Sequence, residues 1–451
     1  MQKKSVSEIP NLLRDLRAQA DERLLAIAAV LIFAFAISYA APVAQRTSTS
    51  QSAFPASVCP AKIGDATTTA FLPKSKILVR HVAAKSLKFY KAPAGTEAIT
   101  SNSLLIDSNP GTTFALNNSA NGLGAVICQS GSADQWFVGG SGGLTSKGTL
   151  DIVNSGLSDA TVDITPYSSK QELPVVTLKI PANSDRQLLV DALVPGDESV
   201  ALHVVTRAGR VTSFLFDQRK KGLRSLGSDY VNSISSAATT LVIPTVLQSS
   251  SGKVSTTLRM LVPGNFDASV KITINSGDGS FTPVGFDQKS VPHGRVVDYS
   301  LADLTSTTPM SVIVESDQPV VASVLSQMSG NDFAWAIPVK ALNKLNRLQM
   351  NFTGLSPTFV FTGADINVSL SWKNAAGKSK SGRVTGRDIA FWNPGKGGLR
   401  TITFVGNKPV YAGAIIRTAA GWRFAYLPLT PSAVLEQSTL PIVDVRSLSR
   451  G

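Results

Sequence analysis

The sequence predicts an all-β protein built from tandem immunoglobulin-like β-sandwich units, and three observations support this prediction. The chain has 451 residues with 43% hydrophobic and only 16% charged residues, so it can bury several cores of ordinary domain size. Val and Thr are abundant while Glu and Lys are few, and this balance favours strands over helices. A short segment of alternating apolar and polar residues also recurs along the chain.

The recurring segment occupies residues 159–165 and 267–273, with a weaker copy at residues 365–371. Each copy begins with Asp and continues with apolar residues at every second position, such as Val162 and Ile164 in the first copy. This period of two is typical of a strand that has one face in a core and the other in water. We therefore expect Val162 and Ile164 in the core and the leading Asp at a turn, where its side chain caps the backbone.

Turn residues around these segments suggest about seven short strands in each unit of roughly 90 to 105 residues, as in a β-sandwich. A propeller, which needs shorter repeats of about 40 to 50 residues, is the minor alternative. The last two strands of each unit are predicted to form a hairpin. The three hairpins join residues 201–205 to 211–215, 311–314 to 320–324, and 401–405 to 410–414.

These patterns divide the chain into eight segments. They are a cytoplasmic N-terminus (1–23), a transmembrane anchor or signal (24–44), a linker (45–57), a disulfide-tied β domain (58–134), β-sandwich repeats 1 (135–238) and 2 (239–333), a basic β-sandwich repeat 3 (334–428) and a C-terminal tail (429–451).

Residues 24–44 contain no charge and have the length needed to cross a bilayer as a helix. The segment is either an uncleaved anchor or a signal peptide, with Ser38 and Ala40 before a cleavage point. Basic residues are more numerous before the segment than just after it, which favours a cytoplasmic N-terminus. We expect a single-pass protein of the cell membrane whose C-terminal part is extracytoplasmic.

The two cysteines, Cys59 and Cys128, are predicted to form a disulfide because exported chains are oxidised. Closing a loop of this length stabilises a fold by roughly 4 kcal/mol on the chain-entropy model. Two buried free thiols are the alternative.

The chain resembles a family of actinobacterial exported, membrane-anchored proteins that carry a domain of unknown function. The resemblance rests on the N-terminal apolar segment, on Cys59-Pro60, on the Trp136 strand before a Gly-rich loop, and on the repeated Asp-Ala-x-Val and Pro-Val-Val-Ala elements. It implies an envelope location and a β architecture, and it brings no catalytic residues.

No motif in the sequence predicts catalysis, a metal site or a cofactor. Residues 139–143 match G-x-S-x-G, but strands are expected on both sides of Ser141, whereas a nucleophile elbow needs a following helix. His81, His203 and His293 have no second ligand at metal-binding spacing. Paired carboxylates of a glycosidase meet in space and not in sequence, so a carbohydrate-active enzyme or its accessory module is the alternative.

Charge gives the strongest functional signal, because the chain carries a net charge of +13 and its basic residues are dense between positions 373 and 423. Asp388 is the only acid there, and Trp392 and Trp422 lie in the same stretch, with Trp372 directly before it. The candidate surface for an anionic polymer consists of Lys378, Lys380, Arg383, Arg387, Lys396 and Trp392. The alternative is that these charges serve solubility and that the tryptophans belong to a core.

The predicted function is that of a non-catalytic, membrane-tethered cell-envelope protein, acting as an extracytoplasmic binding or scaffold module. Its expected partners are the membrane, through the N-terminal helix, and either an anionic wall polymer or an envelope protein. Nucleic acid is not expected, because the predicted compartment lies outside the cytoplasm.

Overall fold

The computed structural model describes most of residues 56–430 and short pieces on either side. The gaps within this range are residues 75, 93–94, 108–110, 121, 248–253, 302–307, 330–331, 345–347, 396–397 and 419–422, and the outlying described residues are 27, 29–33, 47–51 and 435–439. The chain forms two compact units, a larger one of residues 51–436 and a smaller one of residues 1–50 and 437–451.

Little of the predicted membrane segment falls within the described residues. Residues 27 and 29–33 are helical, and the rest of residues 24–44 lies outside the described part. Over the residues that the structure describes, no helix has both the length and the apolar character needed to cross a membrane. Near the two ends of the chain, β1 (Thr47–Gln51) pairs with β32 (Leu435–Thr439).

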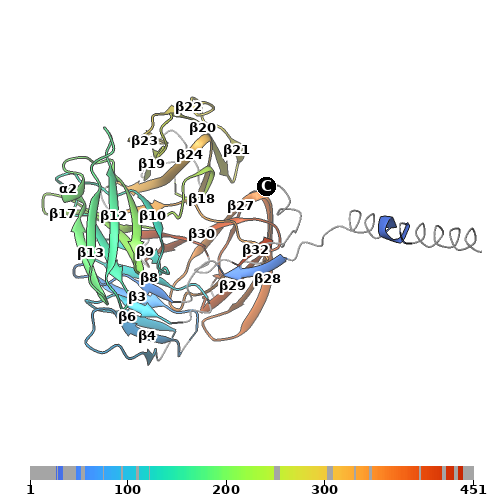
Figure 1. Cartoon of the computed structure of the whole chain (residues 1–451), viewed down its shortest axis with the longest axis horizontal. Coiled ribbons are helices and arrows are strands. Elements are labelled where there is room, and N and C mark those ends of the chain that lie inside the picture. Colours follow the sequence, from blue (N-terminus) through green and yellow to red (C-terminus); the bar gives the residue numbers. More distant parts are fainter. Residues whose placement is uncertain are drawn as a thin grey trace, which may run out of the picture. The chain divides into compact units, whose positions relative to one another are not determined.

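The larger unit is built almost entirely of antiparallel sheets, so the predicted all-β class is confirmed (Figure 1). Its first group comprises two four-stranded sheets with the orders β2-β7-β4-β5 and β6-β3-β8-β9. The strands are β2 (Ser57–Cys59), β3 (Thr67–Phe71), β4 (Leu78–His81), β5 (Tyr90–Lys91), β6 (Thr96–Ile99), β7 (Leu104–Ile106), β8 (Phe114–Ser119) and β9 (Gly122–Ile127).

The second group again has two four-stranded sheets, with the orders β10-β15-β12-β13 and β14-β11-β16-β17. Its elements are β10 (Asp134–Val138), β11 (Thr149–Asn154), β12 (Ala160–Tyr167), β13 (Val176–Ile180), β14 (Ser184–Leu189), the short helix α2 (Val190–Leu193), β15 (Ala201–Ala208), β16 (Val211–Lys221) and β17 (Arg224–Val231).

The third group is an eight-stranded sheet of order β21-β20-β24-β19-β23, in which β18 and β25 also pair with β24, and β22 pairs with β20. The strands are β18 (Ala238–Val246), β19 (Val254–Leu261), β20 (Ala268–Ser276), β21 (Gly279–Phe281), β22 (Lys289–Val291), β23 (Val296–Ser300), β24 (Met310–Met328) and β25 (Phe333–Ala336).

The fourth group is a six-stranded sheet of order β26-β29-β27-β30-β31, in which β28 also pairs with β27. Its strands are β26 (Leu348–Asn351), β27 (Thr358–Lys373), β28 (Ser379–Trp392), β29 (Thr401–Gly406), β30 (Tyr411–Arg417) and β31 (Phe424–Pro428).

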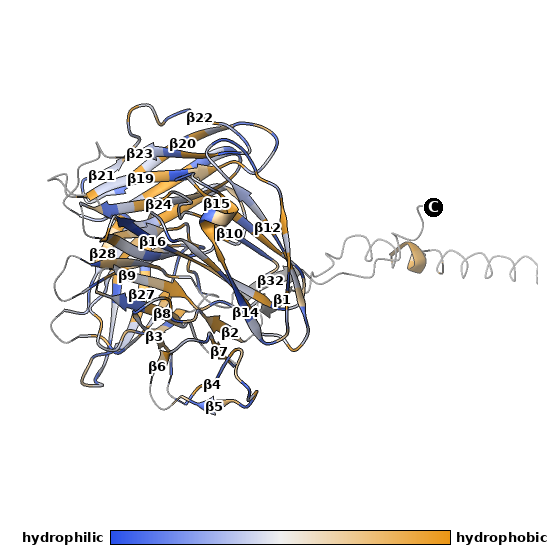
Figure 2. Ribbon diagram, turned by 90° about the vertical axis from the view of Figure 1, so that its left-hand side faces the viewer, coloured by the Kyte–Doolittle hydropathy of each residue, from blue (hydrophilic) through white to orange (hydrophobic). Residues whose placement is uncertain are grey.

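The recurring segment forms the strand that the alternation predicted in all three places, within β12, β20 and β27. The apolar positions of the three copies are fully buried or nearly so, namely Val162, Ile164, Val270, Ile272, Val368 and Leu370. The intervening residues are half-buried or exposed, and Figure 2 shows hydrophobic and hydrophilic residues following one another along such strands.

The leading Asp of the first two copies caps a turn, as predicted. Asp159 accepts the backbone N–H of Ala182 at 3.2 Å, and Asp267 accepts that of His293 at 3.0 Å. In the third copy Asp365 instead pairs with Lys408. Turn capping therefore accounts for the leading Asp in the first two copies, and a surface ion pair accounts for it in the third.

The predicted hairpins at the end of each unit are wrong. β15 and β16 belong to different sheets, and residues 311–314 and 320–324 are parts of the single strand β24. β29 and β30 both pair with β27, at opposite halves of that strand. The turn residues Asp317, Gln318 and Pro319 lie where β24 leaves one set of partners for another, so they mark a bend and not a reversal.

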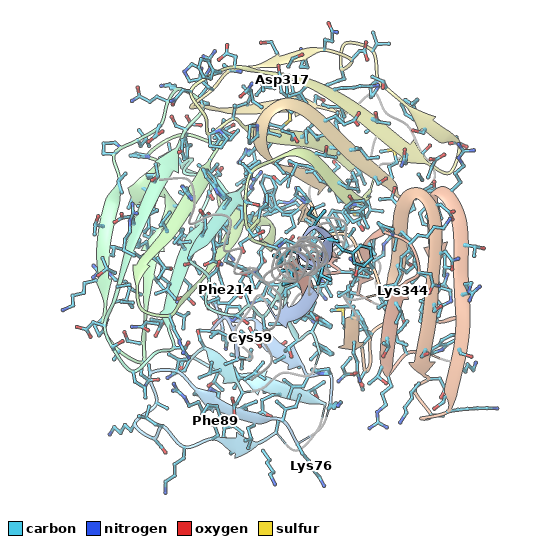
Figure 3. All side chains as sticks on the ribbon, turned by 45° about the vertical axis from the view of Figure 1, so that its right-hand side comes forward. Cys59, Lys76, Phe89, Phe214, Asp317 and Lys344 are labelled. Atoms are coloured by element: carbon cyan, nitrogen blue, oxygen red, sulfur yellow. A yellow bond between two sulfur atoms is a disulfide. The ribbon has the colours of Figure 1, made fainter. Side chains whose placement is uncertain are left out.

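Each of four hydrophobic cores is shared by two neighbouring groups, and one of them joins the fourth group back to the first. One core joins the first group to Phe214 and Tyr230 of the second, and another joins the second group to Trp335 of the third. A third core joins the third group to Tyr426 of the fourth, and the last joins the fourth group to Phe114 of the first. In Figure 3 the blue, green, gold and orange sheets of the larger unit accordingly follow one another around a centre.

The final strand of each group, namely β9, β17, β25 or β31, takes part in this closure. β9 contacts β17 and β31, and β25 contacts the same two strands, so the four strands form a cycle. Because neighbours lie on both sides, β9 is buried along its whole length.

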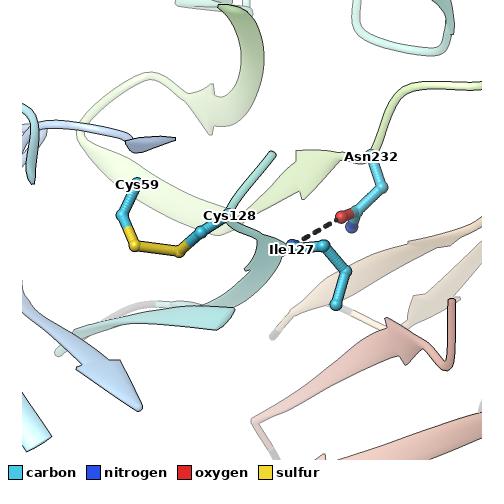
Figure 4. The surroundings of a disulfide bond; sticks show 4 residues. All are labelled: Cys59, Ile127, Cys128 and Asn232. Carbon is cyan, nitrogen blue, oxygen red and sulfur yellow. Dashed lines mark hydrogen bonds between the residues drawn. A yellow bond between two sulfur atoms is a disulfide. The ribbon is translucent and has the colours of Figure 1, made fainter. Parts of the chain in front are cut away.

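The predicted disulfide between Cys59 and Cys128 is confirmed (Figure 4). Both cysteines are fully buried. The bond ties β2 to the residue that directly follows β9, where backbone bonds between Val58 and Gln129 support it.

Candidate functional site

Buried polar side chains occupy the middle of the cycle of four strands. The carboxyl group of Asp332 accepts the N–H of Phe424 in β31 at 3.2 Å. The backbone N–H groups of Leu123, Ser228 and Phe333 also interact with this carboxyl group, so each of the four strands contributes one. Burial nevertheless raises the pKa of Asp332 to about 8. The one carboxyl group thereby joins all four groups of sheets.

Asp229 repeats this arrangement one step along the strands. Its carboxyl group accepts the N–H of Ala125 at 3.2 Å and that of Trp335 at 2.8 Å. Asn232 makes a third step, accepting the N–H of Ile127 at 2.9 Å and donating to the carbonyl of Ala125 at 3.0 Å (Figure 4). Along β9, alternate N–H groups therefore meet Asp332, Asp229 and Asn232 in turn, and we call these three side chains the axial column.

The axial column is supported by Asp217, which accepts the indole N–H of Trp335 at 3.0 Å and binds Arg219. Backbone packing is tight as well, because a Cβ on Gly227 would lie 2.5 Å from a carboxyl oxygen of Asp332. Gly227 also has a φ of +114°, which favours glycine. Both the space around residue 227 and its backbone conformation therefore require glycine at this position.

A cavity of about 520 Å³ lies where the four central strands end. Its lining includes Ile127 at the end of β9, Asn232 just after β17, Ile337 just after β25 and Pro428 at the end of β31. The volume is in the range of small-ligand sites. Asn232, the last member of the axial column, is thus part of the cavity lining, and the disulfide lies beside it.

The cavity lining combines apolar residues with small polar ones. The hydroxyl and amide side chains are Gln129, Ser130, Ser132, Asn232, Ser233, Ser235, Ser236, Thr240 and Thr430. Gln129 accepts bonds from Gln135 at 2.9 Å and Ser233 at 2.8 Å, which fixes one part of the lining. The charged lining residues are Asp134 and Lys340. Such a site suits a ligand rich in hydroxyl or amide groups.

Asp134 is the only carboxylate among these lining residues, and it bonds to His203 at 3.0 Å. His203 stacks on Trp136 with a centroid distance of 3.7 Å, and burial lowers its pKa. The geometry of a glycosidase needs a second carboxylate across the cleft.

The other residues considered for chemistry lie apart from this cavity. Ser141 is buried in the loop between β10 and β11, where its Oγ accepts the N–H of Gly143 at 3.1 Å. His81 bonds to Tyr90, and His293 bonds to Asp267. Within the described ranges no group of three or more His, Cys, Asp or Glu side chains could hold a metal ion.

The structure distributes the predicted anionic-polymer residues over the β27–β28 pair. Arg383 lies opposite Ser369, and both alternate with the buried Val384 and Val368, so they belong to the outward face. Lys378 follows the turn after β27, and Lys380 lies opposite Trp372 on the core-facing side.

Arg387 is exposed on β28, and Lys396 lies outside the described residues. Trp392 is half-buried, packs 5.1 Å from Trp372 and borders the core. Arg383 and Arg387 are therefore exposed residues of the same strand, β28, while the rings of Trp392 and Trp372 meet edge to face on the core side.

Sequence reasoning missed the axial column. Asp229 and Asp332 each precede an aromatic residue, in Asp229-Tyr230 near the end of β17 and in Asp332-Phe333 at the start of β25. This shared pair was the available signal, but it gives no hint that the strands meet at one centre.

Comparison with known proteins identifies a family but no function. A model of a family of unknown function, DUF5719, matches residues 108–385, which is more than half of the chain. No curated protein matches.

Among solved structures, Thermotoga maritima 1070 is 19% identical, covering 21% of this chain and 87% of its own, with a TM-score of 0.19. The Anabaena sensory rhodopsin transducer is 24% identical, covering 19% and 97%, with a TM-score of 0.17. A tetra-tandem repeat from the extending region of a large adhesion protein is 10% identical, covering 88% and 100%, with a TM-score of 0.12. With TM-scores this low, none of these structures carries an argument about fold or function. The chain belongs to the DUF5719 family, whose function is unknown.

Proposed function

We propose that this chain is a non-catalytic, membrane-tethered protein of an actinobacterial cell envelope, and that it acts outside the cytoplasm as a binding or scaffold module. Its partner is an anionic wall polymer, or an envelope protein that carries similar negative charge. The second, third and fourth groups of sheets would be the tandem immunoglobulin-like sandwich units, and the first group would be the disulfide-tied β domain that precedes them. The resemblance of the sequence to exported actinobacterial proteins supports this placement.

The observation that carries the proposal is the group of exposed basic side chains on β27, on β28 and in the turn between them, in which Lys380 and Arg383 lie on opposite faces. Lys373, Lys378, Lys380, Arg383 and Arg387 are all exposed, and Asp388 is the acid in this stretch of sequence. β28 pairs only with β27 among the described strands, so no strand covers its other edge, although Asn275 of β20 donates to the carbonyl of Asp388 near its end. Cations on an open, rigid edge can meet successive charges of a linear polyanion.

Tethering is supported by the apolar residues before the larger unit. Ile27, Val30, Leu31, Ile32 and Phe33 are helical and exposed, which is a costly arrangement in water. A bilayer around residues 24–44 would remove these side chains from water.

The test is a pull-down of the protein by isolated wall polymer, comparing the parent chain with a variant that carries Lys378→Glu, Lys380→Glu, Arg383→Glu and Arg387→Glu. We expect the variant to lose at least about tenfold in affinity, and the loss to shrink at high salt because surface charges are screened. A matched control reverses Lys147, Lys170, Lys221 and Lys271, which are exposed elsewhere. Equal binding by all three proteins would overturn the proposal.

A second candidate function is an accessory module that binds carbohydrate, and the hydroxyl-rich cavity favours it. Ser235 is exposed at the cavity lining, so Ser235→Trp should fill the space without disturbing a core. Calorimetric titration with soluble wall saccharides should show binding by the parent and none by Ser235→Trp. Heat release that is identical in both proteins, or absent from both, counts against this candidate.

A further inference from the structure

The first group of sheets presents a β-hairpin whose exposed surface mixes lysines with large apolar side chains. The hairpin comprises residues 76–92 and includes β4 and β5. The N–H of Lys76 donates to Ala92, and that of Ala92 donates to Ile77, which closes the base of the hairpin. Its inner side chains Ile77, Val79, Val82 and Ala92 are buried in the core, so the hairpin is firmly attached.

Four large apolar side chains of this hairpin are open to solvent. Leu78, Phe89 and Tyr90 are each 39% exposed, and Leu87 is 49% exposed. Of the other exposed large hydrophobic residues described in the larger unit, Phe281 and Val284 lie close in sequence and the rest are widely spaced, so the hairpin holds the largest local group. A local concentration of this kind marks an interaction surface.

Exposed lysines alternate with these apolar side chains, namely Lys76, Lys85, Lys88 and Lys91. The sequence contains no acid between Asp65 and Glu97. The carboxylate of Glu97, the next acid along the sequence, accepts a hydrogen bond from the Tyr90 hydroxyl at 3.0 Å. Figure 3 shows Lys76 and Phe89 at the same outer edge of the larger unit. The surface is therefore apolar and positively charged.

The exposed ring of Phe89 is supported from behind by a fixed cation. The guanidinium of Arg80 lies 5.7 Å from the ring centroid. Arg80 is itself buried and donates to Asn183 at 2.5 Å and to the carbonyl of Ser155 at 3.1 Å, both in the second group of sheets. The contact with Arg80 thus fixes the position of the Phe89 ring in the unbound protein.

We propose that the hairpin of residues 76–92 docks onto an anionic lipid bilayer. Leu87 and Phe89 would enter the headgroup region, where aromatic side chains are favoured, and the lysines would meet lipid phosphates. Tyr90 lies opposite Val79 on the other face of the hairpin, where it bonds to Glu97, and would stay outside the bilayer. A soluble polyanion can satisfy the lysines but leaves the apolar side chains in water, which is why a bilayer fits this surface better. This inference rests on the proposed extracytoplasmic position beside a membrane, and it concerns a surface separate from β27–β28.

Hydrogen exchange of the full chain, mixed with nanodiscs, tests the docking locally. Nanodiscs of phosphatidylcholine alone are compared with nanodiscs that also contain phosphatidylglycerol. We expect amides of residues 83–91 to exchange at least about fivefold more slowly with the anionic discs. The triple variant Lys85→Glu, Lys88→Glu and Lys91→Glu, and separately Phe89→Ser, should abolish this slowing.

A control variant reverses Lys147, Lys170 and Lys271 and should keep the slowing. The docking is overturned if residues 83–91 exchange equally with both kinds of disc, or if soluble polyphosphate slows them as much as anionic lipid does. The hairpin variants should still be captured by wall polymer, so failure here is distinguishable from failure of the proposed function.

Discussion

At the residue scale, two buried carboxyl groups, those of Asp332 and Asp229, hold together the centre where the four strands meet. Strand edges that meet at a centre leave N–H groups that no neighbouring strand accepts, and an unsatisfied buried N–H is costly. Asp332 and Asp229 provide acceptors for these N–H groups. Because each carboxyl group contacts several strands, one substitution should affect the whole centre.

Asp332→Ala should lower the free energy of unfolding by about 3–5 kcal/mol, because it leaves backbone N–H groups of several strands without an acceptor. Asp365→Ala removes an exposed carboxylate of β27 that pairs with Lys408 at the surface and should change stability by no more than about 0.5 kcal/mol. Urea unfolding followed by tryptophan fluorescence measures both. Equal effects of the two substitutions would show that the buried carboxyl group has no special role.

Asp151 should make stability depend on pH. Burial, with a contribution from Asp185, raises its pKa from 3.8 to about 8. The folded protein therefore holds this proton more tightly than the unfolded chain, so stability falls as the pH rises from about 4 to about 8 and then levels off.

Asp151→Asn removes this titration. The free energy of unfolding of the variant minus that of the parent should increase by roughly 2–4 kcal/mol as the pH rises from 4 to 8. The comparison with the parent matters, because the raised pKa of Asp332 acts in the same direction. Unfolding curves at several pH values test this, and a constant difference between the two proteins across that range would contradict it.

The strands themselves are the elements that sequence reasoning predicted best. Alternation is a local property, so the buried Val162 and Ile164 and their counterparts could be identified from the order of residues alone. The partners of a strand are not local. β24 changes partners midway, and nothing within residues 310–328 distinguishes a bend at Pro319 from a hairpin turn.

Equivalent core positions should have similar energetic effects. Ile164→Ala and Ile272→Ala should each cost about 2–5 kcal/mol, because each leaves a cavity in a packed core. Lys271→Ala, on the exposed face beside Ile272, should cost no more than about 0.5 kcal/mol. Thermal unfolding of the three variants tests the assignment, and a larger loss for Lys271→Ala than for Ile272→Ala would reverse the two faces.

At the scale of the whole larger unit, the first and last groups of sheets meet. Phe114 lies 5.1 Å from Phe352, and Arg423 donates to Asn118 at 2.8 Å. The sequence predicted repeated β units, but these contacts join residues 238 and 305 positions apart and leave no periodic trace, so neither the closure nor the central cavity could be inferred. The basic residues of β27–β28 were identified from sequence, whereas their division between two faces depended on register.

Because the groups of sheets close on one another, the larger unit should unfold in a single cooperative transition. The disulfide should add to the free energy of unfolding. Replacing both Cys59 and Cys128 by Ala frees the segment beside the central cavity and should cost roughly 4 kcal/mol on the chain-entropy model. If closure couples the groups, fluorescence and circular dichroism will still report one shared transition. Two separate transitions in the parent protein would show independent groups.

The most direct test of the closed arrangement is residue-resolved hydrogen exchange of the parent and of Asp332→Ala. Closure around one carboxyl group predicts that the amides of Leu123, Ser228 and Phe424 exchange slowly in the parent and accelerate together in the variant, although they lie in three different groups of sheets. Acceleration confined to Phe333 and its neighbours in sequence would contradict the closed arrangement.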